Sequence, residues 1–447
     1  MHISLSDHFN YRRLLRFTLP SIIMMIFTSV YGVVDGLFVS NFVGKTPFAA
    51  INLIWPFLMI LGCGGFMIGT GGSALVSKTM GEGDGDRANR YFSLLVLTTV
   101  LLGAAITVPG FFLLEPVAIL LGADEAMLPY CVTYGRIILT AQTAFMLQSI
   151  FQSFLITAER PTLGLVVTVA AGVTNMVLDL LFIAVFRWGI VGAAAATAIS
   201  QAVGGLIPLI YFLLPNKSPL RLVLPGLRVG HSLRVIGRVS VNGSSELMTN
   251  IAMSVVSMLY NYQLMRLAGE DGIAAYGVMM YVSFVFIAVF IGFAIGSAPI
   301  VGFHYGAGNH GELKSLLRKS LTLTILTGVG MAALSVALAT PLSGIFVGYD
   351  EGLYELTRRG FLLYSSSFLF AGFGILGSSF FTALGNGVIS AAISFLRTLL
   401  FQVAAVLILP IFFDIDGVWL SVTAAEILAA GVTFAFLVGM RRRYKYM

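Results

Sequence analysis

Long apolar segments separated by short polar or glycine-rich turns run through the whole chain. Each is long enough to cross a hydrocarbon core of about 30 Å as a helix. There are twelve such segments, at 14–43, 47–80, 91–114, 127–157, 161–186, 189–214, 233–264, 273–303, 316–346, 353–383, 387–413 and 417–440. The turns between them carry helix-breaking sequences, such as GEGDGD at 81–86 and GAGNHG at 306–311. The pattern predicts an all-α polytopic membrane protein.

Composition supports this class. Of the 447 residues, 58% are hydrophobic and only 10% are charged, whereas soluble domains carry about 25% charged residues. The two cysteines, Cys63 and Cys131, both lie in apolar segments, which argues against a disulfide framework or a zinc site. The first apolar segment is too long for a signal peptide and no A-x-A pattern follows it, so we expect an uncleaved N-terminus.

Charge predicts the orientation. Most of the 26 Lys and Arg residues flank turns on the side of the membrane that holds the N-terminus. Because cytoplasmic loops are enriched in these residues, both termini are expected in the cytoplasm. The basic sequence RRRYK at 441–445 is interpreted as a membrane flank or a lipid-headgroup contact, and no nucleic-acid partner is expected.

The chain also repeats itself at an offset of 225 residues. The matching pairs are Gly44 with Gly269, Gly71 with Gly296, Gly81 with Gly306, Pro116 with Pro341, and Gly192 with Gly417. Two halves of six spans that start on the same side predict parallel repeats around a central cavity, an arrangement typical of transporters. We predict an amino-terminal lobe at 1–214, a cytoplasmic linker at 215–231 and a carboxy-terminal lobe at 232–447.

An aspartate in the first span is the main candidate for function. Placing the Asp35 carboxylate inside the bilayer costs about 2.5 to 3.5 kcal/mol, so the side chain must face protein or water. Thr28, Tyr31, Asp35 and Phe38 recur at helical spacing and share one stripe. The stripe is expected to point inward. Asp35 is then either a functional-site residue or a residue that only holds helices together through hydrogen bonds.

The fifth and sixth spans offer partners for Asp35. Asn175 and Asp179 are four residues apart and share a helix face. With the hydroxyl of Thr197 they would form an oxygen cluster suited to a monovalent cation or a shared proton. Singly, Asn175 and Thr197 could instead make ordinary interhelical hydrogen bonds. The offset maps Asp35 onto Tyr260, so the halves are expected to share a scaffold but not a site.

Other embedded polar residues leave more than one interpretation open. Glu246 in the seventh span either binds an ion or substrate, or snorkels to the nearby interface. Gln148 and Gln152 share a helix face that lines the cavity or contacts another helix. Arg397 and Glu426, in the last two spans, are expected to pair with each other.

Enzyme motifs are weak. The GKT at 44–46 has Val39 where a phosphate-binding loop needs its first glycine. His304 and His310 lack metal-ligand spacing and have no Cys/His cluster around them. We therefore expect a protein that is not an enzyme, needs no cofactor, and uses an ion gradient for any pumping.

Several segments together resemble the multidrug and toxic compound extrusion (MATE) transporters, in a bacterial DinF-like or MepA-like branch. They are YGVVD at 31–35, TNMVLD at 174–179, GIVGAAAATAIS at 189–200, and the GEG and GAG turns at 81–83 and 306–308. The resemblance implies twelve helices, a coupling-cation site at Asp35, Asn175, Asp179 and Thr197, Tyr31 beside it, and a bend at Pro20. It further implies a monomer in the bacterial plasma membrane that exports small organic cations.

Two points qualify the resemblance. Relatives with a carboxy-lobe sodium site have acids in both the seventh and the tenth span, whereas the tenth span here has Tyr364 and serines. The alternative function is a flippase for lipid or polyprenyl-linked substrates, whose cavity tends to be cationic. The embedded charges here are mainly acidic, which favours a cation antiporter with H+ or Na+ as the coupling ion.

Overall fold

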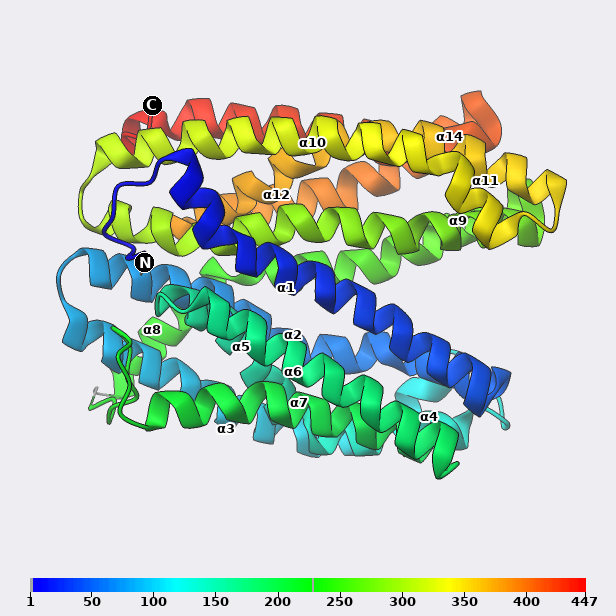
Figure 1. Cartoon of the computed structure of the whole chain (residues 1–447), viewed down its shortest axis with the longest axis horizontal. Helices are drawn as coiled ribbons and strands as arrows, with labels where there is room; N and C mark the ends of the chain where they lie inside the picture. Colours follow the sequence, from blue (N-terminus) through cyan, green and yellow to red (C-terminus); the bar gives the residue numbers. More distant parts are fainter. Residues whose placement is uncertain (1–2, 227–228) are drawn as a thin grey trace.

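The protein is described by a computed structural model that covers residues 3–226 and 229–447, so positions 227 and 228 of the predicted linker lie outside the described residues. Within this part of the chain all regular structure is helical. The helices form two bundles that lie one above the other in Figure 1, with both termini at the same end.

The first half contains seven α-helices and two π-helical segments. They are α1 (Tyr11–Phe38), η1 (Val39–Val43), α2 (Lys45–Gly81), α3 (Gly85–Leu120), α4 (Leu128–Thr140), α5 (Gln142–Thr157), α6 (Pro161–Asp179), η2 (Leu180–Val185) and α7 (Ile190–Leu213). The second half contains α8 (Val229–Asn242), α9 (Ser244–Gly306), α10 (His310–Val347), α11 (Glu351–Tyr364), η3 (Ser365–Ser367), α12 (Phe368–Ala383), α13 (Gly387–Phe395), η4 (Leu396–Leu400) and α14 (Phe401–Tyr444).

These elements make twelve spans. Nine segments of the described chain are long and apolar enough to cross a membrane. Two of them are pairs of spans, because α9 turns at Gly269 (φ 64, ψ −145) and α14 turns at Asp414 (φ 48, ψ −131). The short helices α4 and α5, which meet at Ala141, together form one more span. The predicted fold class, twelve helices in two repeats, is confirmed.

The start of the seventh span differs from the prediction. Residues 233–242 belong to the separate amphipathic helix α8, which buries Val235 and Val239 and exposes Leu233. Gly243 ends this helix and lies against α2: a Cβ atom there would be 1.9 Å from the carbonyl oxygen of Met67. This approach requires glycine at position 243, and the seventh span begins directly after it, at Ser244.

The two halves pack against each other through α1 and α2 on one side and α9 on the other. A contact made by α2 of the first half has an equivalent contact made by α9 of the second. A Cβ atom on Gly71 would lie 2.8 Å from the backbone nitrogen of Gly243, and one on Gly296 would lie 3.1 Å from Cα of Thr18. Both members of the first contact are 225 residues from their counterparts in the second. The sequence repeat is therefore a pseudo-two-fold relation in space.

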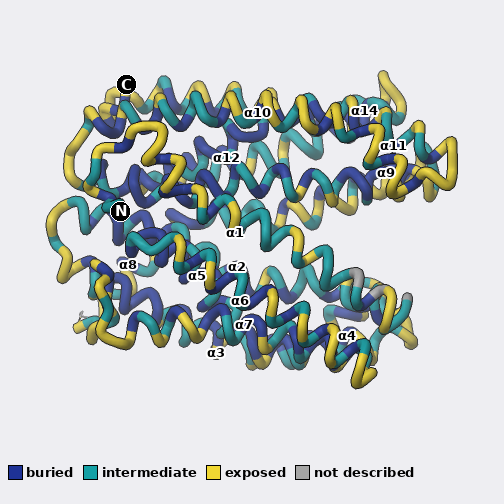
Figure 2. The backbone as a smooth tube through the Cα atoms, viewed as in Figure 1, coloured by how far each residue is buried: buried dark blue, intermediate teal, exposed yellow. Residues whose placement is uncertain are grey.

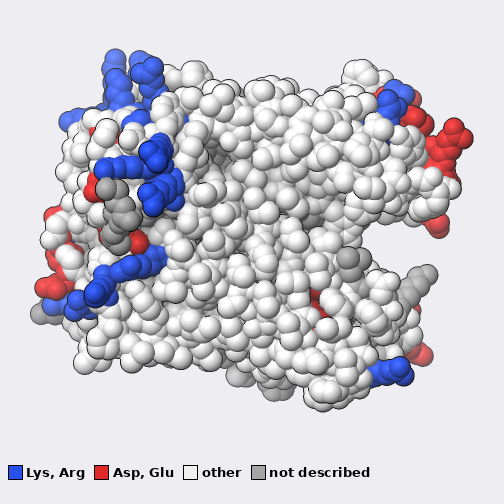
Figure 3. All heavy atoms as spheres, viewed as in Figure 1, with Lys and Arg blue, Asp and Glu red and all other residues white. Residues whose placement is uncertain are grey.

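The bundles are closed at one end and separated at the other. At the end that carries the termini, buried residues continue from one bundle to the other (Figure 2). Lys and Arg gather at this same end, and the surface is hollowed between the bundles at the opposite end (Figure 3). The central cavity therefore opens away from the termini.

Candidate functional site

Three helices of the first half bring the predicted cation-site residues together. Asp35 lies in the last turn of α1, Asn175 and Asp179 lie one turn apart on α6, and Thr197 lies on α7. Helix α1 packs on α6, and α6 packs on α7. The π-helix η1 begins four residues after Asp35, and η2 begins directly after Asp179. Such π-helical turns occur frequently at functional sites.

The cluster formed by these four residues, the N-half site, is rich in buried oxygen atoms. The carboxyl of Asp35 is close enough to Asp179 and Asn175 to interact with both side chains. Asp179 is fully buried and Asn175 is 2% exposed. Oδ1 of Asp35, both carboxylate oxygens of Asp179 and the Thr197 hydroxyl have no hydrogen-bond partner of normal geometry among the described residues. Two adjacent buried carboxyls of this kind are suited to share a proton or to bind a cation.

Two tyrosines border the N-half site. Tyr31, one helical turn before Asp35, interacts electrostatically with it. Tyr134 of α4 lies close to both aspartates and to Thr197. Tyr134 was missed by the sequence analysis, because nothing local distinguishes it from the other tyrosines in apolar segments. It reaches the site because α4 packs on α7.

The remaining predicted residues of the first half lie outside the N-half site. Phe38 packs with Val39, Ile183 and Ala193 where α1 meets η2 and α7. Gln148 lies against Gly204 of α7, where a Cβ atom would be 2.6 Å from its side chain. Gln152 is half-buried in α5. Pro20 lies inside α1, which is continuous from Tyr11 to Phe38, so the proposed bend stays a prediction.

A central cavity of about 910 Å³ lies between the halves. Helices α1, α2 and α5 of the first half and α9, α12 and α14 of the second contribute to its wall. As far as the described residues define it, the lining includes Glu246 but none of Tyr31, Phe38, Gln148 and Gln152. Glu246 stands in the first turn of α9, near the closed end, with serines and threonines around it.

Three charged side chains line this cavity within the described chain: Glu246, Arg397 and Glu426. Nε of Arg397 donates to both carboxylate oxygens of Glu426 at 3.0 and 2.8 Å, and Nη2 lies 2.8 Å from Oε1. The predicted pairing is thus confirmed. Within the described ranges no cation pairs with Glu246, so the cavity carries one uncompensated acid.

The second half has different chemistry at the position equivalent to Asp35. There the hydroxyl of Tyr260 donates to Oε1 of Gln402 at 2.9 Å, and its ring stacks on Tyr276 with centroids 5.3 Å apart. The prediction that the halves share a scaffold but not a site agrees with these contacts. Among residues 3–226 and 229–447, no group of three or more His, Cys, Asp or Glu side chains converges to hold a metal ion.

The chain is similar over most of its length to proteins named as multidrug exporters. The multidrug export protein MepA of Staphylococcus saprophyticus is 23% identical over 410 residues, which are 92% of this chain and 88% of the relative. MepA of Staphylococcus aureus strain MRSA252 is 22% identical over 439 residues, covering 97% and 94%. A crystal structure of MATE in complex with MaL6 superposes with a TM-score of 0.92 at 20% identity, over 98% of each chain.

A second solved structure, the outward-facing conformation of a multidrug resistance MATE family transporter, also has a TM-score of 0.92, at 21% identity over 98% of both chains. The MatE family model matches twice, at residues 20–181 and 247–408. The two matches cover the same portion of each six-span half, including Asp35 and Asp179 in the first. The chain therefore belongs to the MatE family of membrane transporters.

Proposed function

We propose that this protein is a secondary active antiporter that exports amphipathic organic cations in exchange for H+ or Na+. The observation that carries the proposal is the buried pair Asp35 and Asp179, because Oδ1 of Asp35 and both carboxylate oxygens of Asp179 have no hydrogen-bond donor among the described residues. Two adjacent buried carboxylates are unfavourable when both are ionised and unpaired, so the pair tends to bind a proton or a cation. The relatives named multidrug export proteins support the direction of transport.

The central cavity supports the substrate class. Its wall combines aromatic rings and methionines with hydroxyl groups; the rings and thioethers include those of Phe48, Tyr260, Tyr276, Tyr281, Phe284, Tyr364, Met25, Met253 and Met280. Aromatic faces attract cations, and methionines adapt to varied apolar shapes. Glu246 adds a negative charge that no described cation offsets. An amphipathic organic cation fits both the aromatic and thioether surface of the wall and the negative charge of Glu246.

Coupling follows from the two alternatives at the N-half site. With a proton bound, the polar cluster can tighten; without it, the two carboxylates favour a cationic partner. The protein alternates between the protonated cluster and the cluster that binds a cation. If each state favours a different open end of the cavity, this alternation produces antiport. If Na+ is the ion, Asn175 and Thr197 supply oxygens beside the aspartates, as hard cations require.

The alternative function is a lipid or polyprenyl-linked flippase. It would need a free cation in the cavity to hold an anionic headgroup. Arg397 is the cation that lines the described part of the wall, and it is already paired with Glu426 at 2.8 Å. The charges in the cavity therefore favour an organic cation over an anionic lipid as the substrate.

The function is tested by ethidium accumulation in cells that overexpress the protein. We expect lower accumulation than in control cells, and loss of the difference when an uncoupler is added. Imposed pH or Na+ gradients in inverted vesicles then identify the coupling ion. Unchanged accumulation of a broad cation panel, together with lipid scrambling in vesicles, would instead establish the flippase.

We also propose that the protein is a monomer in the bacterial plasma membrane with cytoplasmic termini, built from the lobes 1–214 and 232–447. The basic end of the molecule supports this orientation (Figure 3). Cysteine placed at Asp86, an exposed residue at that end, should react with an impermeant maleimide only after the cells are opened. Cys63 and Cys131 are buried and give little background. Labelling from outside intact cells would reverse the orientation.

A further inference from the structure

A second pocket lies at the closed end of the molecule, outside the central cavity. It has a volume of about 390 Å³ and lies between α8 and the turn that joins α12 to α13. Arg234 and Arg238 form one side, and residues 385–388 form the other. Since α8 packs on α2 and α3 while α13 belongs to the second half, the pocket lies where the two halves meet.

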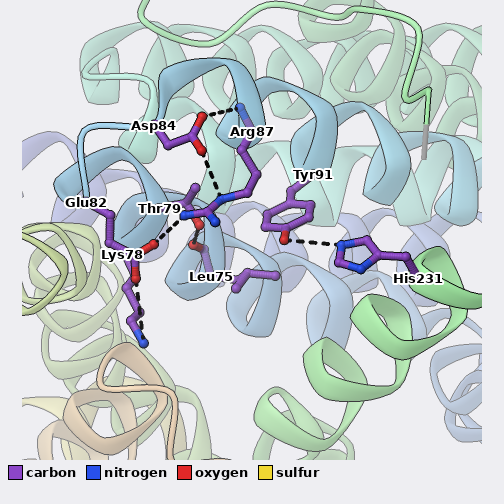
Figure 4. Close-up of polar contacts among 8 residues, drawn as sticks. All are labelled: Leu75, Lys78, Thr79, Glu82, Asp84, Arg87, Tyr91 and His231. Carbon is purple, nitrogen blue, oxygen red and sulfur yellow. Dashed lines mark hydrogen bonds and ion pairs between the residues drawn. The ribbon is translucent and has the colours of Figure 1, made fainter. Parts of the chain in front are cut away.

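The helix that carries the two arginines is anchored to the bundle, and no described acid neutralises them. They are four residues apart on α8, so they share a face. The helix is anchored by buried Val235 and Val239 and by the Tyr91 hydroxyl, 3.4 Å from Nε2 of His231. In Figure 4, by contrast, Arg87 in the first turn of α3 is paired with Glu82 and Asp84 of the preceding turn. No described acid forms such a pair with Arg234 or Arg238.

The opposite wall adds further positive potential. It contains the N-terminus of α13, where Oδ1 of Asn386 accepts from the backbone N–H of Ile389 at 3.3 Å. The N–H groups of Gly387 and Val388 precede this bond in the first turn, where helices attract anions. Gly387 allows the close approach to α8: a Cβ atom there would lie 2.3 Å from Cα of Asn242.

Asn242 in the pocket wall indicates what else the ligand carries. Its side chain is 5% exposed, and its Nδ2 donates to the carbonyl of Thr382 at 2.9 Å. Its Oδ1 has no partner in the described part of the chain. An acceptor beside two arginines is satisfied by a ligand with both an anionic group and a hydroxyl donor. Val241 and Val388, 54% and 70% exposed, flank the pocket with apolar surface.

We propose that this pocket binds the phosphate of an anionic phospholipid of the phosphatidylglycerol type. The phosphate contacts Arg234, Arg238 and the first turn of α13. A glycerol hydroxyl of the headgroup donates to Asn242, and the acyl chains begin along Val241 and Val388. Basic pockets between helices at the cytoplasmic membrane surface commonly hold such headgroups. The site is separate from the transport cavity and does not depend on the proposed antiport.

The test is lipid binding to the purified full-length protein in detergent, measured by native mass spectrometry during titration with phosphatidylglycerol. The double variant Arg234→Gln/Arg238→Gln should weaken binding about tenfold or more. The matched control Arg221→Gln/Arg318→Gln removes the same charge from exposed arginines outside the pocket and should stay within about twofold. Val388→Glu places a carboxylate at the exposed mouth and should weaken binding without affecting folding.

The outcomes separate the possible sources of the phosphate. Millimolar inorganic phosphate should not displace the lipid; displacement would make free phosphate the ligand and overturn the lipid assignment. Equal loss of affinity in the pocket variant and its control would show unspecific attraction to the basic end. Equal affinity for phosphatidylcholine would show that the pocket does not distinguish an anionic from a zwitterionic headgroup. Either result overturns the proposal.

Discussion

Gly81 and Gly306 occupy the same place in the two halves and make reciprocal contacts at the closed end. A Cβ atom on Gly81 would lie 2.0 Å from the carbonyl oxygen of Phe303, and one on Gly306 would lie 2.0 Å from the carbonyl oxygen of Lys78. Gly81 and Gly306 are 225 residues apart, as are Lys78 and Phe303. The glycines therefore allow α2 and α9 to touch backbone to backbone where the bundles converge.

Gly81→Ala should destabilise the protein. The new methyl group meets backbone that cannot rotate away, and overpacking of this kind costs about 1–3 kcal/mol. Gly439→Ala in α14 is the control, because a Cβ atom there meets nothing within 4 Å and alanine favours a helix over glycine by about 1 kcal/mol. Thermal unfolding in detergent should show a lower Tm for the first variant only. Equal Tm values would show that the close approach is dispensable.

Asp35→Asn and Asp179→Asn should each abolish gradient-driven efflux while leaving the protein folded. The amide keeps the shape of the protonated acid but cannot release a proton or compensate a cation. Asp86→Asn, at an exposed position, is the control and should export normally. Efflux of ethidium under an imposed gradient is the measurement. Near wild-type rates for both variants would make the N-half site structural, and Glu246 would become the residue to test.

Glu246→Gln should weaken substrate binding without lowering stability. Removing the charge takes away an attraction of about 1–3 kcal/mol for a cation in the cavity, and it also removes the cost of an unpaired acid. The apparent affinity for ethidium should fall about tenfold, while the Tm should be unchanged or higher. The control is Glu351→Gln, at an exposed position. A transport curve that matches wild type would exclude contact between Glu246 and the cation.

Glu426→Gln should destabilise the protein by at most about 3–5 kcal/mol, because it leaves the guanidinium of Arg397, which is 15% exposed in the cavity wall, without its counter-ion. Replacing both residues, as Arg397→Met/Glu426→Leu, should recover most of this loss. Unfolding of the wild type, Arg397→Met, Glu426→Leu and the double variant forms a thermodynamic cycle. If the two single losses simply add in the double variant, the pair contributes no coupling.

The N-terminal segment joins the two halves across the closed end. Glu159 of the first half accepts hydrogen bonds from the hydroxyl of Ser4 and the N–H of Leu5 at 2.6 and 2.7 Å. Glu312 of the second half accepts from the N–H of Phe9 at 2.9 Å. Leu5 and Phe9 are fully buried, in a core that includes residues of both halves.

Glu312→Gln should loosen this segment. The variant loses a carboxylate that accepts hydrogen bonds from two residues, His8 and Phe9, and bonds to charged groups contribute about 1.5–3 kcal/mol each. With cysteine at position 5 in place of Leu5, maleimide labelling should be slow in the parent and several-fold faster in the variant. Glu355→Gln, which removes an exposed charge paired with Arg358, should change nothing. Equal rates in all three proteins would show that Glu312 does not hold the segment.

The spans and the repeat were readable from the sequence, because a bilayer requires long apolar helices and because repeated glycines mark repeated close contacts. Burial of charge is costly in the same solvent, so Arg397 and Glu426 could be expected to pair, as they do. For the same reason Asp35 and Asp179 could be selected as candidates, and helix packing places them within reach of each other.

Tertiary structure alone decided which side of each helix faces the cavity. Gln148 packs against α7, whereas Glu246 lines the cavity, although both are polar residues in apolar spans. Tyr134 and the N-terminal segment have no local signal, since their partners are far away in the sequence. The break between α8 and α9 falls at Gly243, which packs against Met67 of another helix. Hydrophobicity specifies that a segment crosses the membrane, but its rotation and ends are set by close packing with neighbours that the sequence does not place beside it.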